Sequence, residues 1–220
     1  MTSKAARRLR GLYAITPESA DTDALAAAVA ACLEGGAALV QYRAKQAHAA
    51  LALEQARRLA GLCHAHGVPL IVNDSVDLAL ASGADGVHLG RGDSGAREAR
   101  ARWPEGIIGV SCYADAERAR AAAADGADYV AVGALFASDT KPAAVRAPLE
   151  LIARARQASG LPVAAIGGIT PDNARAVLAA GADMVAVISA VFGAPDVRAA
   201  ARAISGLFGD PDVRAQQDAV

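Results

Sequence analysis

The chain contains few aromatic residues and few cysteines, and its net charge is close to zero. Each of these features excludes some classes of protein. Phe, Trp and Tyr make up 4% of its 220 residues, and three residues are Cys. No apolar run reaches the ~18 residues that a membrane-spanning helix needs. The net charge of −1 provides no overall field for nucleic acid. We therefore expect neither a membrane nor a nucleic acid among its partners, and the oligomeric state is left open.

The cysteines stand far apart, at Cys32, Cys63 and Cys112. They form no paired metal-ligand or redox motif, so we expect reduced, buried thiols of a cytoplasmic protein. The first ten residues are basic but precede no apolar stretch of the secretory kind. Residues 1–10 are therefore predicted to be a flexible solvated arm, and the polar residues 208–220 a frayed tail.

Hydrophobic residues are abundant, at 54%, and their arrangement is periodic. Short β-branched runs predict strands at Leu12–Thr16, Ala38–Arg43, Leu70–Asn73, Gly86–Leu89, Ile107–Ser111, Tyr129–Gly133, Val163–Gly167 and Met184–Ile188. Alanine-rich stretches predict helices at Asp23–Glu34, Ala49–His66, Val76–Ala81, Ala96–Arg102, Ala116–Ala124, Leu149–Ala158, Pro171–Ala179 and Pro195–Ser205. This alternation predicts an α/β fold, a single-domain (βα)8 TIM barrel over residues 11–207.

A Gly-Ala-Asp triplet occurs three times between a predicted helix and the next strand, at Gly83–Asp85, Gly126–Asp128 and Gly181–Asp183. Glycine at this point ends a helix in the left-handed conformation. The aspartate is expected to hydrogen-bond local backbone in the turn. All three acids would then lie at the amino-terminal face of the barrel, where they stabilise the fold.

Functional residues of such a barrel gather at the carboxyl ends of the strands. Gln41 and Arg43 share one face of the second strand, and Lys45 follows them if the strand continues. Cations on an inward face require an anionic partner, so this pattern favours a phosphate or pyrophosphate ligand. The alternative is that Arg43 and Lys45 are solvated loop charges.

Two acids follow neighbouring strands: Asp74, after Asn73 at the end of the third, and Asp93, after the fourth. Paired carboxylates beside a polyphosphate are suited to Mg²⁺, which prefers oxygen ligands. The alternative for Asp74 is a helix cap.

Three residues on the fourth and fifth strands are weighed in the same way. The hydroxyl of Ser111 can reach a phosphate oxygen, whereas Cys112 has no neighbouring base and is interpreted as a packed thiol. His88 is expected to form a hydrogen bond in the core.

The remaining candidates belong to loops. The loop after the sixth strand, a candidate lid, carries Ser138, Thr140 and a third cation, Lys141. Gly168 and the residues ending the eighth strand, Ile188 and Ser189, occupy the phosphate site that recurs after strands 7 and 8 of such barrels. The predicted rim thus has two anion sites, which a single monophosphate would not need.

From about Leu12 to Ile204 the sequence resembles the thiamine phosphate synthase family. The resemblance is carried by ordered motifs: Gln41-x-Arg43-x-Lys45, Asn73-Asp74, Gly86 to Asp93, Gly109-Val110-Ser111, Thr140-Lys141, Ile166 to Ile169 and Ile188-Ser189. It departs from the family at Ala134 and Ala137, where proline is frequent, and at Arg91, where glutamine is frequent.

The resemblance implies condensation of hydroxymethylpyrimidine diphosphate with a thiazole phosphate, with Mg²⁺ as cofactor. It assigns Arg43, Lys45, Lys141, Asn73 and Ser111 to the pyrophosphate, and Asp74 and Asp93 to the metal. It assigns Gly168, Ile188 and Ser189, with Ser138 and Thr140, to the thiazole phosphate. Alternatives are a thiazole tautomerase-like enzyme, a non-catalytic phosphate-binding regulator, and another phosphate-using barrel enzyme such as an aldolase, which would need a lysine within a strand.

Overall fold

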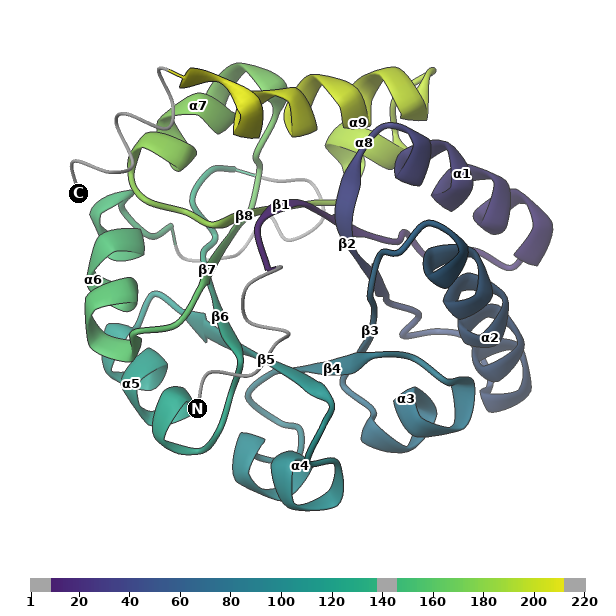
Figure 1. Cartoon of the computed structure of the whole chain (residues 1–220), viewed down its shortest axis with the longest axis horizontal. Helices are drawn as coiled ribbons and strands as arrows, with labels where there is room; N and C mark the ends of the chain where they lie inside the picture. The colour runs from purple at the N-terminus through teal and green to yellow at the C-terminus, as the bar shows by residue number, and fades with distance from the viewer. Residues whose placement is uncertain (1–8, 138–145, 212–220) are drawn as a thin grey trace.

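The chain forms a closed barrel of parallel strands surrounded by helices (Figure 1). The computed structural model describes residues 9–137 and 146–211, and in it each strand pairs with the next and β8 pairs with β1. The strands are β1 Gly11–Ile15, β2 Ala37–Tyr42, β3 Leu70–Asn73, β4 Gly86–Leu89, β5 Ile107–Tyr113, β6 Tyr129–Val132, β7 Val163–Ile166 and β8 Met184–Val187. The predicted single-domain (βα)8 barrel is confirmed.

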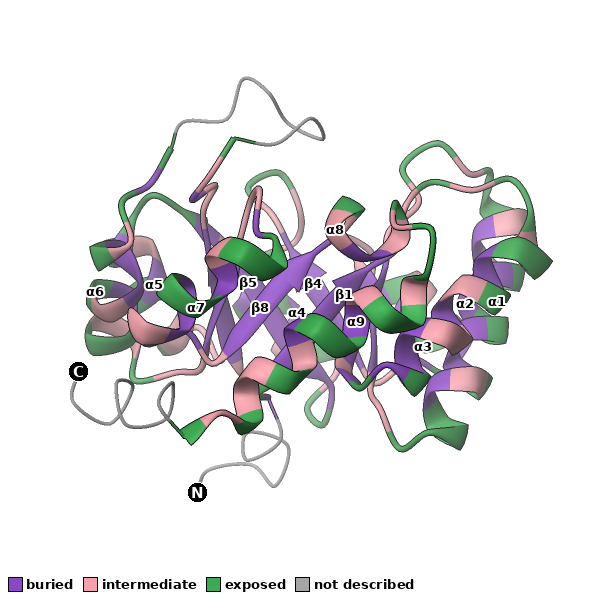
Figure 2. Cartoon of the chain, turned by 90° about the horizontal axis from the view of Figure 1, so that it is seen from above, coloured by how far each residue is buried: buried purple, intermediate pink, exposed green. Residues whose placement is uncertain are grey.

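A helix follows every strand and packs on the outside of the barrel. The helices are α1 Thr22–Glu34, α2 Ala49–Ala65, α3 Val76–Ser82, α4 Ala96–Arg102, α5 Ala116–Ala124, α6 Glu150–Ser159, α7 Pro171–Ala179, α8 Ser189–Phe192 and α9 Val197–Ser205, followed by the 3-10 turn η2 Gly206–Gly209. The short helix α8, between β8 and α9, lies at the carboxyl end of the strands (Figure 2).

Side-chain caps fix where several helices begin. The carboxylates of Asp21, Asp115 and Asp196 accept backbone N–H groups of the first turns of α1, α5 and α9. The cap at Asp196 explains why the last helix starts at Val197, two residues later than the sequence predicts.

The core has two layers, because alternate strand residues point to opposite sides of the sheet. Gln41 points into the barrel, whereas the next residue, Tyr42, points outward and donates a hydrogen bond to Gln55 of α2 at 2.8 Å. The inner layer consists of Leu9, Tyr13, Ile15, Leu39, Ile71, Ile107, Tyr129, Ala131, Ala164, Met184 and Ala186. Leu9, which the sequence analysis placed in the N-terminal arm, is therefore buried inside the barrel.

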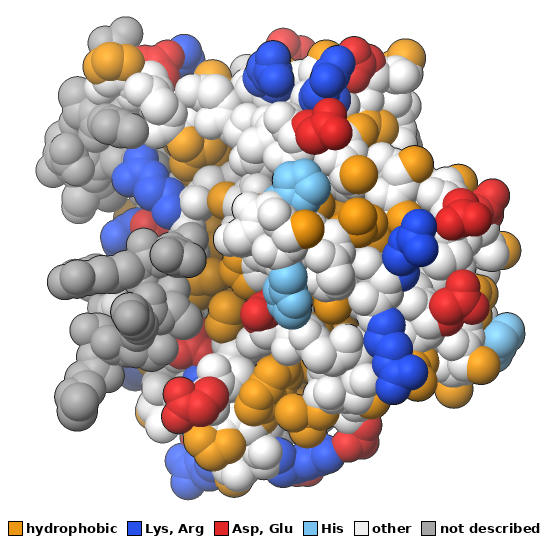
Figure 3. Space-filling model, turned by 45° about the vertical axis from the view of Figure 1, so that its right-hand side comes forward, with side chains coloured by type: hydrophobic (Ala, Val, Ile, Leu, Met, Phe, Trp, Pro, Cys, Tyr) orange, Lys and Arg blue, Asp and Glu red, His pale blue; other side chains and the backbone are white. Residues whose placement is uncertain are grey.

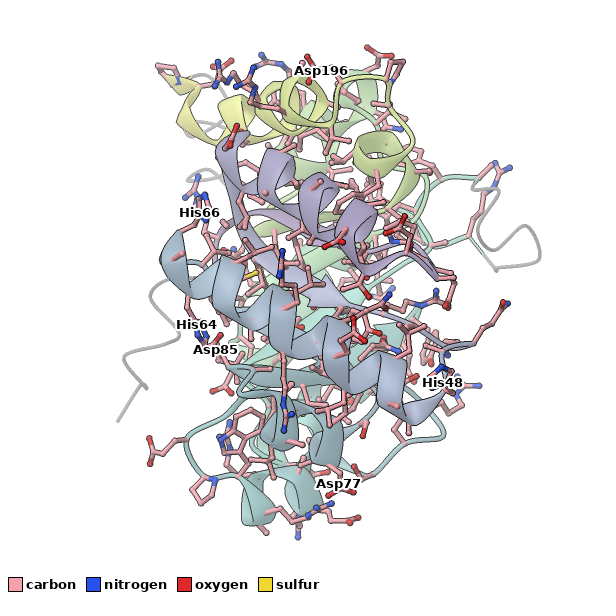
Figure 4. All side chains as sticks on the ribbon, turned by 90° about the vertical axis from the view of Figure 1, so that its right-hand side faces the viewer. His48, His64, His66, Asp77, Asp85 and Asp196 are labelled. Carbon is pink, nitrogen blue, oxygen red and sulfur yellow. The ribbon has the colours of Figure 1, made fainter. Side chains whose placement is uncertain are left out.

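The aspartates of the Gly-Ala-Asp triplets are structural, as predicted, but their backbone partners are not local. Each carboxylate accepts the N–H group of the first or second residue of the preceding strand, at 2.8 Å, in the pairs Asp85 with Leu70, Asp128 with Ile108 and Asp183 with Val163. Each also faces a basic side chain, in the pairs Asp85 with His64, Asp128 with Arg100 and Asp183 with Arg156. Figure 4 shows His64 beside Asp85 at one end of α2, with His48 at the other.

We call each of these aspartates, with its N–H group and its basic partner, an aspartate clamp. The clamps lie at the amino-terminal face, so removing one should lower stability without changing the carboxyl-terminal face. The Asp128 side chain is 14% exposed and binds Arg100 at 2.5 Å, so Asp128→Ala removes the anionic partner of a half-buried cation and the acceptor of the Ile108 N–H group. We expect a loss of about 2–4 kcal/mol in the free energy of unfolding, measured by urea denaturation. Asp125→Ala removes a more exposed carboxylate paired with Arg97 in the same turn and should cost less than about 1 kcal/mol. Equal losses would contradict the structural role of the triplet.

The outer surface is charged and mixed in sign. On the face shown in Figure 3, basic and acidic side chains are interspersed, in keeping with ion pairs such as Arg58–Asp23 and Arg102–Asp77. Among the described residues, no helix combines the length and apolar character needed to cross a bilayer.

Candidate active site

A cavity of about 720 Å³ lies at the carboxyl ends of the strands. Seven of the side chains or glycines singled out in the sequence line it, namely Gln41, Arg43, Asn73, Ser111, Gly168, Ile188 and Ser189. They come from five strands or the loops that follow them, so closure of the barrel is what brings them together.

The end of β2 separates the predicted cation pair. Arg43 lines the cavity with its side chain 20% exposed, and its backbone N–H group donates to Thr16 at 2.9 Å. The strand ends at Tyr42, so Arg43 follows it directly whereas Lys45 lies three residues beyond it, where strand alternation no longer applies. Its side chain is 54% exposed, and its ammonium nitrogen is 3.3 Å from a carboxylate oxygen of Asp74. Lys45 therefore belongs to the rim beside the cavity.

Glu18 shapes this rim, and the sequence analysis did not identify it. One carboxylate oxygen accepts the backbone N–H group of Lys45 at 2.6 Å and lies 3.9 Å from the guanidinium of Arg43. The other accepts the N–H group of Gln46 at 3.4 Å. Glu18 follows β1 by three residues, and an acid in such a loop carries no pattern that separates it from ordinary surface charge.

The predicted carboxylate pair is formed by Asp74 and Asp93. The cap of α3 is Ser75, which accepts the Leu78 N–H group at 3.1 Å, so the alternative reading of Asp74 as the cap is wrong. Asp74 has a φ of 65° and pairs with Lys45. Asp93 accepts the Gly90 N–H group at 2.6 Å.

Burial raises the pKa of Asp93 above its ordinary value, and the adjacent Asp74 carboxyl raises it further. The Gly90 hydrogen bond and Lys45 act in the opposite direction. The Asp74 carboxyl therefore lies close enough to Asp93 to disfavour the charge on Asp93.

This donor set fits a magnesium ion that is shared with a ligand. Two neighbouring carboxylates that repel one another gain stability from a divalent cation placed between them. Within residues 9–137 and 146–211, no group of three or more His, Cys, Asp or Glu side chains is arranged to hold a metal. Such an ion would therefore need oxygens from water or phosphate, which is how Mg²⁺ is usually bound.

The opposite wall of the cavity has closely packed backbone. Gly167 and Gly168 have φ values of 104° and 61°, and a Cβ on Gly168 would lie 2.1 Å from the carbonyl oxygen of Ala137. Ser189 and Ala190, which also line the cavity, begin α8, and the first N–H groups of a helix have no partner within it. Donors of this kind suit a phosphate.

His88 and Ser111 meet at the floor of the cavity. The Nε2 atom of His88 lies 2.9 Å from the Ser111 hydroxyl, and its Nδ1 atom lies 2.9 Å from the hydroxyl of Tyr129. The predicted core hydrogen bond of His88 is therefore confirmed. Cys112 is buried, and burial raises the pKa of its thiol to about 12, as expected for a packed thiol. Cys32 and Cys63 are likewise buried and free.

The other residues that line the cavity include Tyr13, Tyr113 and Arg91, none of which was predicted to belong to the site. Tyr13 lies in a predicted strand, where alternation with Ile15 places it on the inner face. Tyr113 ends β5 after an irregularity and has a φ of 55°, so simple alternation does not orient it. The guanidinium of Arg91 stacks on the Tyr113 ring at 4.9 Å, which places this departure from the family pattern on the cavity wall.

Several predictions lie outside the described residues. They are the lid residues Ser138, Thr140 and Lys141, most of the N-terminal arm (residues 1–8) and most of the C-terminal tail (residues 212–220).

Comparison with known proteins agrees with this geometry. The family profile described as thiamine monophosphate synthase matches residues 12–191. The thiamine-phosphate synthase of Aromatoleum aromaticum is 60% identical over 89% of this chain and 95% of its own length, and that of Azoarcus sp. is 57% identical over 86% and 92%. The structure of thiamine phosphate pyrophosphorylase from Pyrococcus furiosus superposes with a TM-score of 0.83 at 38% identity, covering 96% of this chain and 98% of that one. The chain therefore belongs to the thiamine monophosphate synthase family.

Proposed function

We propose that this chain is a transferase that condenses 4-amino-5-hydroxymethyl-2-methylpyrimidine diphosphate with 4-methyl-5-(2-hydroxyethyl)thiazole phosphate, or its carboxylated form. The products are thiamine phosphate and pyrophosphate. The observation that carries the proposal is one cavity that Arg43 lines at one side and glycine-rich backbone at the other, with Asp74 directly after the lining residue Asn73 and close to Asp93. Two phosphorylated substrates need two such anion sites.

In the proposed reaction the bond between the pyrimidine methylene carbon and the diphosphate oxygen breaks, and its electron pair leaves with pyrophosphate. The thiazole nitrogen then donates its lone pair to the resulting cation and forms the new C–N bond. Neither step requires a strong base. Arg43 and Lys45 stabilise the charge that develops on the leaving group, with Asn73 and Ser111 donating hydrogen bonds.

Asp74 and Asp93 would hold the magnesium ion, and when bound it neutralises charge on the diphosphate oxygens. Gly168, Ile188 and Ser189 hold the phosphate of the second substrate, so that its ring approaches the cation from the other wall. Lys141, Ser138 and Thr140 are assigned to the same substrates on the family resemblance alone.

The alternatives fit this rim less well. A thiazole tautomerase-like enzyme or a phosphate-binding regulator would use the glycine-rich wall but has no need of a carboxylate pair beside cations. A Schiff-base aldolase needs a lysine in a strand, and β1 to β8 contain none.

The test is pyrophosphate release from the two substrates, followed with a coupled phosphate assay and by chromatography of thiamine phosphate. We expect product only when both substrates and Mg²⁺ are present, and no product after chelation with EDTA. A folded protein that binds the thiazole phosphate but releases no pyrophosphate from the pair would contradict the proposal and favour the tautomerase or the regulator.

A further inference from the structure

Five side chains form a continuous line of hydrogen bonds across the barrel interior, which we name the interior relay. It runs from Gln41 on β2 to Tyr13 on β1, Tyr129 on β6, His88 on β4 and Ser111 on β5. The four successive distances are 2.5, 2.7, 2.9 and 2.9 Å. Four members line the cavity, whereas Tyr129 does not and is 0% exposed.

The sequence makes room for this line at one position. A Cβ on Gly109 would lie 2.0 Å from the ring of Tyr129, so the ring can enter the barrel only because residue 109 is glycine. Gly109 and Ser111 share the inner face of β5, since residues two apart in a strand point the same way. The Gly109-Val110-Ser111 motif thus supplies both the space for the relay and its last member.

The number of protons on each group decides which member of each hydrogen bond in the relay is the donor. The amide nitrogen of Gln41 can only donate, so the Tyr13 hydroxyl accepts. Its single proton then goes to Tyr129, and the proton of Tyr129 goes to Nδ1 of His88. Burial raises the pKa of both phenols above the ordinary value, so each keeps its proton at neutral pH.

The tautomer of His88 follows from this direction. With Nδ1 accepting, the ring proton of the neutral histidine is on Nε2, which donates to the Ser111 oxygen. Ser111 lines the cavity, so its own proton is left to point toward a ligand there. If the amide of Gln41 were reversed, every bond would reverse, and Ser111 would donate to His88.

We infer that Tyr129 is a positioning residue, which holds His88 in the Nε2–H tautomer and thereby makes the Ser111 hydroxyl a hydrogen-bond donor to the substrate. Tyr129 acts through two other side chains and does not itself line the cavity. The substrate named here rests on the proposed function, whereas the tautomer does not.

The first test is the ¹⁵N spectrum of the His88 ring, because protonated and unprotonated ring nitrogens have different chemical shifts. Replacing the exposed His48, His64 and His66 with glutamine leaves His88 as the one histidine, since the sequence has 4. We expect a protonated Nε2 in this background and loss of that single tautomer after Tyr129→Phe. A protonated Nδ1 before the substitution would overturn the inference.

The second test is kinetic and uses a matched control. Tyr129→Phe should lower kcat by about tenfold or more and change KM for the diphosphate little. The reason is that a Ser111 hydroxyl that no longer points at the substrate stabilises the transition state less. In a Ser111→Ala background the same substitution should have no further effect. Tyr42→Phe also removes one buried phenolic hydroxyl, but from a tyrosine bonded to Gln55 outside the relay, and should change neither kcat nor the His88 spectrum.

The outcomes separate the relay from the proposed function. An equal loss of kcat from Tyr129→Phe with and without Ser111 would overturn the positioning role. Absence of thiamine phosphate from the unmodified protein would overturn the proposed function, and the ¹⁵N spectrum would still decide the tautomer. If Tyr129→Phe does not fold, Tyr13→Phe breaks the relay one bond earlier and is expected to give the same spectral change.

Discussion

Asp93→Asn is expected to lower the rate of pyrophosphate release by about 100-fold or more without lowering the thermal unfolding midpoint. Asparagine keeps an oxygen that accepts the Gly90 N–H group, but it removes a carboxylate whose charge is disfavoured by burial and by Asp74. A carboxyl with a raised folded-state pKa opposes folding when it is ionised at neutral pH, so its neutral analogue should leave stability unchanged or higher. Activity should thus fall while stability stays the same or rises.

The loss should be recovered in part at high Mg²⁺ concentration, because the remaining carboxylate of Asp74 binds the ion more weakly alone. Asp77→Asn is the control, since Asp77 is an exposed aspartate on α3 that pairs with Arg102 away from the cavity. Unchanged activity and Mg²⁺ dependence in Asp93→Asn would contradict the metal assignment.

Of the substitutions that add one methyl group to the glycine-rich wall of the cavity, Gly168→Ala should lower activity the most. The new Cβ would lie 2.1 Å from the Ala137 carbonyl oxygen, so the backbone at Gly168, which lines the cavity, has to shift. Because a phosphate contacts such backbone directly, we expect an increase of about tenfold or more in KM for the thiazole phosphate and a fall in kcat of similar size. Steady-state kinetics with the diphosphate held at saturation measures both.

Gly160→Ala is the control that distinguishes the effect of crowding at Gly168 from the effect of backbone strain. Gly160 has a φ of 67°, close to the 61° of Gly168, but nothing lies within 4 Å of its added Cβ. It should therefore cost about 1 kcal/mol of stability through the left-handed conformation alone and leave KM unchanged. Similar kinetics in the two variants would mean that crowding at Ala137 is not what matters.

The barrel itself was predictable because its signals are local. Each strand is a short β-branched run, and the three Gly-Ala-Asp triplets mark where strands begin, so the strand ends differ from prediction by at most two residues. Gln41 and Arg43 line the cavity as strand alternation predicts, although Arg43 is one residue past the end of β2. Lys45 was expected to follow them only if the strand continued, and the strand stops at Tyr42, after which Glu18 accepts the Lys45 N–H group.

The relay could not be predicted, because it depends on contacts between strands that are far apart in sequence. Tyr13 and Tyr129 are separated by 116 positions, and their hydroxyl groups meet only when the barrel closes. Each looks like an ordinary core aromatic in its own strand. The cap of α3 was also missed: Asp74 was weighed as a metal ligand or as the cap, whereas the cap is the next residue, Ser75.

The aspartate clamps also divide the barrel into modules. They join β3 to β4, β5 to β6 and β7 to β8. In Gly36-Ala37-Ala38 the position that matches the aspartate is Ala38, the second residue of β2, against which Gly11 packs without a carboxylate. At the amino-terminal face, the clamps therefore hold the strands together in pairs. A chain divided between β4 and α4 would leave every clamp whole within one half, because Arg100 of α4 pairs with Asp128. That point is therefore the natural place to exchange half-barrels between relatives.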